Sequence, residues 1–259
     1  MIVAVITFSA QGAQAARKLV SAFPQWTMYV HETTAANVPS ARPFHSVSQL
    51  VSEIFRLYAG LVFIGPVGVA VRAIAPHLKH KTQDPAVVVV DVLARWAVSL
   101  VSGHEGGAND LAITVGNVLS AEPVISTTTE AIKNLIVGIG CRRGVVHTDI
   151  LNAIQKTLTD AHLELNEVRL LSSVDRKSDE EGLLTAARRL GIPLRFITSD
   201  EIRNCHLAFR RSSFVEEKIN VPAVAEPCAL LAGRRTQLIV GKTIFPGVTI
   251  AIARESCSL

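Results

Sequence analysis

Short runs of aliphatic and β-branched residues alternate along the chain with longer segments in which apolar residues return every three or four positions. The continuous run Val87–Val90 is typical of a strand that is covered on both faces. Such runs, separated by helical segments, predict an α/β fold. We expect two α/β domains with largely parallel sheets flanked by helices. The predicted strands are 2–7, 26–31, 60–64, 86–91, 96–101, 123–126, 134–139, 165–172, 194–197, 236–240 and 248–253, and the predicted helices are 11–22, 46–58, 67–78, 107–119, 148–161, 179–190 and 226–233.

The α/β alternation restarts once, near residues 127–133. Three threonines end the first series, and an apolar strand followed by glycines opens the second at Leu135. We therefore divide the chain into domains 1–130 and 131–259. The connection between them is short, so we expect the two domains to pack together and leave a cleft.

The composition is typical of a globular, cytoplasmic protein. Apolar residues make up 49% of the 259 residues, enough for a sizeable core, and charged residues only 19%, which argues against extended disorder. Every apolar run is interrupted before it reaches membrane-spanning length. The first residues lack the basic start and cleavage site of a signal peptide.

The formal charge of +4 lies in the second half, because residues 1–130 hold eight basic and eight acidic side chains. These basic residues form no dense stripe and aromatic residues are 5%, so we expect no nucleic-acid partner. The four cysteines are widely spread and show no metal-ligand spacing. We therefore expect neither a bound metal nor a disulfide framework.

His104 is the strongest candidate for chemistry. It follows Gly103 at the point where a predicted strand ends, and the pair Gly106-Gly107 precedes the next helix. Glycines let a ligand approach the backbone, and helix starts offer free N–H groups to anions. An imidazole with a pKa near 6.5 suits general-base work at neutral pH. No serine or cysteine sits in a recognisable nucleophile elbow, so activated water is the expected nucleophile.

Further polar side chains complete the catalytic candidates. Glu105, or Asp110, could orient the imidazole. Asn109 could donate to an oxyanion, or simply cap the helix. Asp91 ends a predicted strand and is either an acid/base carboxylate or a hairpin-turn residue.

Two further segments of the first half are candidate anion sites. Gly68 and Arg72 belong to a glycine-marked turn after strand 60–64, which is either a carboxylate cradle or an ordinary tight turn. Lys81 and Asp84 precede strand 86–91 and lie either at a site mouth or in a solvated basic loop.

The second half offers a similar set. Arg142 and Arg143 follow its first strand on a glycine-rich turn, beside Cys141, which is more typical of packing than of nucleophilic chemistry. Lys177 follows another strand. Glu226 begins a short helix, and Lys242 follows strand 236–240. If the sheets are parallel, these residues and the His104 and Arg72 segments face one cleft.

Taken in order, these segments resemble the CbiG family of cobalamin biosynthesis. The resemblance to its amino-terminal domain rests on Gly68–Pro76, Lys81 with Asp84–Val87, Asp91, Ser102–His104 and Gly106–Asn109. The resemblance to its carboxy-terminal domain, which the small CobE proteins share, rests on Gly138–Arg142, Asp175–Lys177 with Glu180, Val224 with Glu226, and Lys242 with Gly247–Ala251. The middle region of longer members is missing, and Glu105 stands where the family usually has an apolar residue.

The resemblance implies hydrolysis of cobalt-precorrin-5A. Its δ-lactone is opened and acetaldehyde is expelled, which gives cobalt-precorrin-5B. His104 would activate water, the Gly106 and Gly107 amides would stabilise the oxyanion, and basic side chains would hold the peripheral carboxylates. No resident cofactor is implied, because cobalt arrives within the substrate. The implied substrate-binding residues are Gly68, Arg72, Lys81, Gly103, Gly106, Gly107, Arg142, Arg143, Lys177, Glu226 and Lys242.

Two other functions remain open at this stage. The missing middle region favours a non-catalytic carrier of corrinoid intermediates, and a weaker alternative is an unrelated anion- or nucleotide-binding domain. The expected partners are the corrinoid substrate and, beyond it, neighbouring corrin-pathway enzymes. The sequence leaves the oligomeric state open, and a homodimer could complete the cleft.

Overall fold

The computed structural model describes residues 1–35, 38, 40–210 and 220–256. The chain divides into two compact units, Met1–Thr127 (unit 1) and Thr128–Leu259 (unit 2). No helix among the described residues is long and apolar enough to cross a bilayer.

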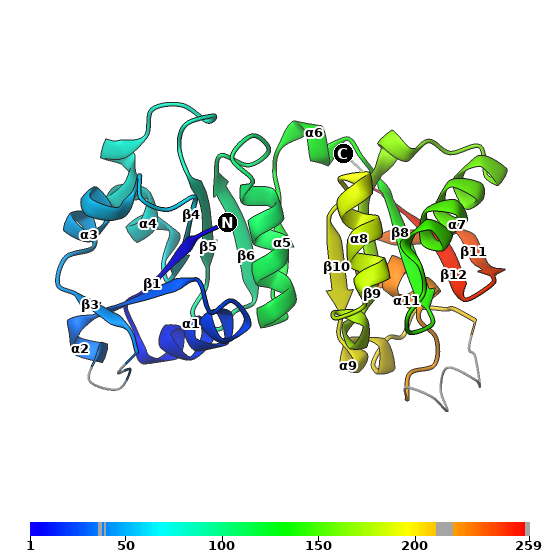
Figure 1. Ribbon diagram of the computed structural model, residues 1–259, viewed down its shortest axis with the longest axis horizontal. Coiled ribbons are helices and arrows are strands. Elements are labelled where there is room, and N and C mark those ends of the chain that lie inside the picture. Colours follow the sequence, from blue (N-terminus) through cyan, green and yellow to red (C-terminus); the bar gives the residue numbers. More distant parts are fainter. Residues whose placement is uncertain (36–37, 39, 211–219, 257–259) are drawn as a thin grey trace. The chain divides into compact units, whose positions relative to one another are not determined.

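Unit 1 is built on a seven-stranded sheet with the strand order β3-β2-β1-β4-β5-β6-β7 (Figure 1). Neighbouring strands are parallel except β5 and β6. The strands are β1 (Val3–Thr7), β2 (Thr27–His31), β3 (Arg42–Phe44), β4 (Gly60–Ile64), β5 (Ala86–Val90), β6 (Trp96–Val101) and β7 (Glu122–Val124).

Helices cover both faces of this sheet, which explains its continuous apolar runs. In β1, Val3 and Val5 pack in the core under α1 and α5, whereas Ala4 and Ile6 pack with α3 and α4 (Figure 1). The Ser9 hydroxyl starts α1 by accepting from the Gly12 amide at 3.1 Å. The helices are α1 (Ala10–Ala22), α2 (Glu32–Ala35), α3 (Val47–Ile54), α4 (Val67–Ile74), continued by a 3-10 turn at Ala75–His77, and α5 (Ala108–Leu119).

The link between β5 and β6 is short, and this fixes their direction. Only Asp91–Arg95 separate the two strands, whereas a parallel crossover needs a dozen or more residues. The carboxylate of Asp91 holds the turn by accepting from the amides of Arg95 (2.7 Å) and Trp96 (2.9 Å). The strands therefore form an antiparallel hairpin, with Val90 opposite Ala97 and Val87 opposite Val101.

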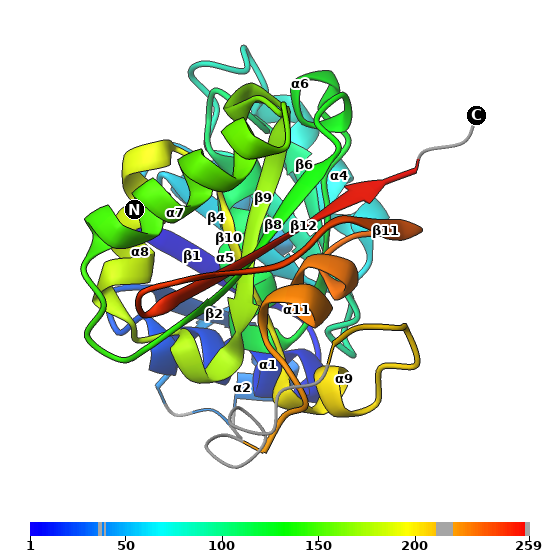
Figure 2. The same ribbon diagram turned by 90° about the vertical axis from the view of Figure 1, so that its right-hand side faces the viewer.

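Unit 2 contains a five-stranded mixed sheet with the order β10-β9-β8-β12-β11. β12 runs antiparallel to both of its neighbours, β11 and β8. The two-residue turn at Pro246 and Gly247 requires this direction for the β11–β12 pair. Figure 2 shows α7 and α8 on one face and α9 and α11 on the other. The elements are α6 (Thr128–Ala131), β8 (Leu135–Cys141), α7 (His147–Asp160), β9 (Val168–Val174), α8 (Glu181–Leu190), β10 (Leu194–Ile197), α9 (Ser199–Arg203), α11 (Ala225–Leu231), β11 (Thr236–Phe245) and β12 (Val248–Glu255), with 3-10 turns at Leu165–Glu167 and Asp175–Lys177.

The expected fold class is confirmed, since seven of the ten strand pairs are parallel. Each predicted strand and helix is present, but some bounds were wrong. The strand predicted from residue 165 begins at Val168, after a 3-10 turn. The strand predicted to end at residue 240 continues to Phe245, because irregular pairing around Gly241 lets the glycine lie within it. The short elements β3, α2, α6 and α9 were not predicted.

Gly138 in β8 permits the close packing of α11, and it provides a stability test. A Cβ there would lie 1.9 Å from the Ala225 carbonyl oxygen and 2.7 Å from the Ala229 amide nitrogen. Gly138→Ala should therefore push α11 off the sheet and lower the free energy of unfolding by about 3 kcal/mol, measured by denaturant titration.

The control for this test is Gly144→Asn. An added Cβ at Gly144 meets nothing within 4 Å, and asparagine tolerates the positive φ of +72° at this position. A Gly138→Ala protein as stable as this control would contradict the packing argument.

Candidate functional site

His104 lies at the tip of a tight turn between β6 and α5. The Ser102 carbonyl accepts from the amides of Gly106 and Ala108, both at 3.1 Å, and the Asn109 amide donates to Gly103 at 3.0 Å. Gly107, the N-cap of α5, has a φ of +83°, which favours glycine. The turn is therefore well fastened, and it holds the side chains of His104 and Glu105 in solvent.

Asn109 fixes this turn from below and does not cap α5. Asn109 is buried, and its side-chain amide accepts from the Ser99 hydroxyl at 2.8 Å and donates to the Thr127 hydroxyl at 3.0 Å. A Cβ on Gly103 would lie 2.6 Å from Thr127 Cγ2 and 3.0 Å from Asn109 Oδ1, so this position requires glycine. These contacts give Asn109 a positioning role; its part as an oxyanion donor stays a prediction.

Glu105, in the His104 turn, forms an ion pair with Lys81, which lies in the loop before β5. The Lys81 ammonium donates to Glu105 Oε1, and this hydrogen bond is the main cause of the lowered pKa of the Glu105 carboxyl. The carboxylate expected to orient His104 is thus bonded to a lysine instead. The contact also brings the Lys81 loop and the His104 turn together, as a shared site would need.

Ser102 is not among the catalytic or binding candidates predicted from the sequence. Its φ is +58°, which is uncommon for a residue with a side chain. Its side chain is buried, and its hydroxyl has no hydrogen-bond partner among the described residues. Strained backbone and unpaired buried groups each cost about 1–3 kcal/mol and gather at functional sites.

Asp84 is a second buried group beside the turn. Its Oδ2 accepts from the Lys79 amide at 2.8 Å, and Arg56 approaches its Oδ1 to 3.8 Å, too far for a hydrogen bond. A Cβ on Gly106 would lie 3.3 Å from the Asp84 carbonyl oxygen, so the Asp84 backbone contacts the turn. The site therefore extends from His104 to Arg56.

The Arg72 turn does not join this site, which corrects the sequence-based expectation. Since β6 is antiparallel to β5, its carboxyl end lies beside Val87, at the edge where β4 and β5 begin. The turn that carries Arg72 follows Ile64 at the other edge, about 13 Å away along a five-residue strand. There the Arg72 guanidinium donates to the Gly68 carbonyl, one helical turn back, at 3.1 Å.

Asp91 also lies at the Arg72 edge, in the hairpin turn. Partial burial raises the pKa of its carboxyl, but hydrogen bonds from Trp96 and Arg95 outweigh this and hold it below its usual value. All its recorded contacts serve the turn. They give no support to an acid/base role, which stays a prediction.

In unit 2, the carboxyl ends of β8 and β9 bring several predicted residues together. The buried Glu180 carboxylate accepts from the Gly144 amide at 2.9 Å and lies 3.4 Å from the Lys177 ammonium. Arg143 pairs with Asp179 at 2.9 Å. The exposed guanidinium of Arg142 has no hydrogen-bond partner among the described residues, so it remains available to a ligand.

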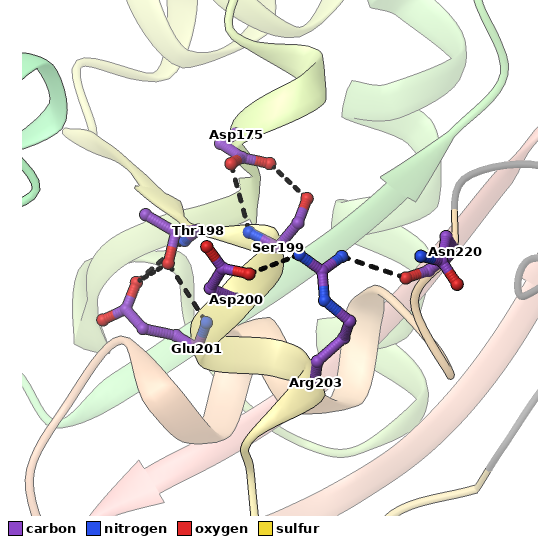
Figure 3. A network of polar contacts seen from close by, with 7 residues as sticks. All are labelled: Asp175, Thr198, Ser199, Asp200, Glu201, Arg203 and Asn220. Atoms are coloured by element: carbon purple, nitrogen blue, oxygen red, sulfur yellow. Dashed lines mark hydrogen bonds and ion pairs between the residues drawn. The ribbon is translucent and has the colours of Figure 1, made fainter.

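Asp175, at the same edge, fastens β9 to α9 (Figure 3). Its two oxygens accept from the Ser199 hydroxyl at 2.6 Å and the Ser199 amide at 3.1 Å. Thr198 and Glu201 form a capping box that starts α9. The network is closed by Arg203, which bonds to Asp200 and to the Asn220 carbonyl (Figure 3). These contacts indicate a structural role for the Asp175 cluster.

The side chain of Glu226 contacts the backbone of Lys242. The buried Glu226 carboxylate accepts from the amides of Arg210 at 2.6 Å and Lys242 at 2.7 Å. Lys242 lies inside β11 and not after it, at the irregular pairing near Gly241. Glu226 thus holds α11 against this strand, and a role of either residue in substrate binding stays a prediction.

Two family models match this chain, one in each unit. The family "Cobalamin synthesis G N-terminal" matches residues 49–130, and "Cobalamin synthesis G C-terminus" matches residues 135–253. A cobalt-precorrin-5A hydrolase from Priestia megaterium is 25% identical over 96% of the chain and 94% of the relative. Protein CobE from Sinorhizobium sp is 32% identical over 49% of the chain and 83% of the relative. The chain belongs to the CbiG family.

The alignment with the Priestia relative spans 352 positions, more than the 259 residues of this CbiG-family chain, so the relative has residues without a counterpart here. The two family matches leave only residues 131–134 between them. A cobalamin biosynthesis protein G homolog from Sulfolobus solfataricus has a solved structure, with 21% identity, a TM-score of 0.39, and coverage of 98% of this chain and 97% of that one.

Removal of the Ser102 hydroxyl should stabilise the protein. Because the buried hydroxyl lacks a partner among the described residues, Ser102→Ala should raise the free energy of unfolding by about 1 kcal/mol. The buried Ser173 hydroxyl donates to the Ile139 carbonyl at 2.8 Å, so the control Ser173→Ala should lower it by a similar amount. If Ser102→Ala and Ser173→Ala lost equal stability in chemical denaturation, the Ser102 hydroxyl could not be an unpaired buried group.

Cys141 should react slowly with alkylating agents at neutral pH. Burial raises the pKa of its thiol to about 11, although the nearby Lys177 ammonium opposes the shift. The reactive thiolate is therefore scarce below the pKa, and the rate of iodoacetamide labelling should rise about tenfold per pH unit from pH 7 to 10, followed by mass spectrometry. A rate that levels off near pH 8 would contradict the raised pKa.

Proposed function

We propose that this chain is a cobalt-precorrin-5A hydrolase, which opens the δ-lactone of the macrocycle and releases acetaldehyde to give cobalt-precorrin-5B. The observation that carries the proposal is its alignment, over nearly the whole of both chains, with a relative of that name. A second relative of the same name, from Salmonella typhimurium, is 25% identical over 77% of the chain. Membership of the CbiG family supports the same activity.

In this proposal His104 is the general base. Its imidazole is exposed at the tip of the turn and has no hydrogen-bond partner among the described residues, so it is free to take a proton from water. The water oxygen attacks the lactone carbonyl, and the ring C–O bond breaks as the carboxylate forms. The alcohol freed in this step then loses its proton as its carbon–carbon bond to the macrocycle breaks, so the two-carbon fragment leaves as acetaldehyde and the bonding electron pair stays on the macrocycle.

Backbone amides of the turn are the proposed donors to the oxyanion. The Gly106 amide is unsuitable, because it already donates to the Ser102 carbonyl. The amides of His104 and Gly107 have no acceptor among the described residues and replace it in the proposal. Gly103 contributes by letting the turn pack against Asn109.

The proposed carboxylate partners of the macrocycle fall into two groups. Arg142 is exposed and has no acceptor among the described residues, which makes it the best supported. Lys81, Arg143 and Lys177 each have a carboxylate partner already, and would have to exchange it or share it. Arg72 lies at the other edge of its sheet, where it donates to the Gly68 carbonyl, so it is left out of these partners.

The remaining expectations complete the proposal. We expect no resident cofactor, because the cobalt is part of the substrate. We also expect the protein to act in the cytoplasm, beside other corrin-pathway enzymes, as a biosynthetic role requires. A homodimer that completes the site remains part of the proposal, and sedimentation analysis of the purified chain would test it.

The decisive test uses His104→Gln and measures acetaldehyde release from cobalt-precorrin-5A. Loss of a general base should lower kcat by about 100-fold or more. The control is His45→Gln, because His45 is an exposed imidazole of the same unit that bonds to Glu32 at 2.5 Å, away from the turn.

The outcomes separate the candidate functions. Acetaldehyde from the unmodified chain, with full activity in His45→Gln and little in His104→Gln, supports the proposed hydrolase. Corrinoid binding without any acetaldehyde would favour the carrier function. Full activity in His104→Gln would remove His104 from the mechanism.

A further inference from the structure

A hollow of about 220 Å³ lies in unit 1 between the end of α3 and the segment that follows α4. Its lining combines two apolar residues, the buried Phe55 and the exposed Pro76, with three basic ones, Arg56, His77 and Lys79. The rings of Phe55 and His77 are 5.6 Å apart, which holds the imidazole against the apolar wall. None of these five residues is among the substrate-binding residues predicted from the sequence.

The basic groups of the hollow have unused hydrogen-bond donors. The Arg56 side chain is 48% exposed, and its one recorded partner, Asp84 Oδ1, is 3.8 Å away, beyond hydrogen-bond distance. The Lys79 ammonium and the His77 ring have no hydrogen-bond partner among the described residues. The single acidic residue recorded in the lining, Glu53, accepts from Gln49 at 3.2 Å, one turn back along α3.

Asp84 keeps these donors in place without consuming them. Its side chain is only 4% exposed, and its Oδ2 accepts from the Lys79 amide at 2.8 Å. Its other oxygen has no hydrogen-bond partner among the described residues and faces the Arg56 guanidinium. The buried charge therefore attracts Arg56 to one end of the hollow but leaves its forked N–H groups free.

The hollow is connected to the catalytic turn through the same residue. The Asp84 carbonyl lies against Gly106, and Lys81, three residues before Asp84, bonds to Glu105. The segment 79–84 therefore contacts both the hollow, through Lys79, and the turn, through Lys81 and Asp84.

We infer that the hollow binds a carboxylate arm of the substrate, with Arg56 as its bidentate partner and Asp84 as a positioning residue. The carboxylate would accept two N–H bonds from Arg56, as guanidinium groups prefer, and a third from Lys79. Pro76, which is exposed, would contact the methylene groups of the arm. The chemical class is an alkyl carboxylate; that it belongs to a corrinoid macrocycle rests on the proposed function.

The first experiment tests the subsite independently of that function. Glutarate, a small alkyl dicarboxylate, is titrated into the ¹⁵N-labelled full chain, and the Arg56 Nε–H and Lys79 amide signals are followed by NMR. We expect both signals to shift in the native chain, and the shift of the Lys79 amide to vanish in Arg56→Gln. Unchanged Arg56 signals in the native chain would overturn the inference.

The second experiment measures the role of the subsite in turnover. Arg56→Gln should raise KM for cobalt-precorrin-5A by about tenfold or more with little change in kcat, because it removes binding that ground state and transition state share. Arg56→Lys, which keeps the charge but loses the fork, should recover part of the loss. The matched control Arg188→Gln removes an exposed arginine of α8 that pairs with Glu181, and should leave KM unchanged.

Failure of this inference and failure of the proposed function are distinguishable. An active chain whose KM is the same in Arg56→Gln would overturn the subsite and leave the hydrolase standing. A chain that binds glutarate at Arg56 but makes no acetaldehyde would keep the carboxylate subsite and overturn the proposed activity.

Discussion

The antiparallel pairing of β5 with β6 decides which groups of unit 1 can act together. If β6 ran parallel, its carboxyl end would place His104 beside the glycine turn of Arg72. The hairpin instead turns β6 around, and the strand delivers His104 to the edge where β5 begins. Lys81 and Asp84 lie there because they immediately precede β5. The candidate site is thus a consequence of a five-residue connection.

The two units use their glycines for different purposes. In unit 1, Gly103 and Gly106 make room within a turn, so that Asn109 and Ser102 can fasten it. In unit 2, Gly138 and Gly140 leave β8 without side chains where α11 and its N-cap pack against it. That close packing buries Glu226, whose carboxylate accepts the Lys242 amide at the irregular strand pairing and the amide of Arg210, which lies outside the strands. Glycine-rich runs of similar appearance thus build a functional turn in one unit and a packing surface in the other.

Much of this arrangement could be predicted from the sequence, because the apolar runs are long and their spacing regular. The hairpin was also within reach, since four residues separated the predicted strands 86–91 and 96–101, too few for a crossover. Arg56 and Ser102 could not be found in this way. Arg56 reads as a solvated helix residue until the fold brings it to Asp84, and the strain at Ser102 exists only in the folded turn.

The charges around the turn also bear on which group takes the proton. The carboxylate next to His104 in the turn, Glu105, bonds to Lys81, and the buried Asp84 carboxylate faces Arg56. The hydrogen bond from Lys81 lowers the pKa of the Glu105 carboxyl, which makes it a weaker base. Of the described side chains at the turn, the His104 imidazole has no such partner. The same ion pairs that shape the site therefore leave the imidazole as its most available base.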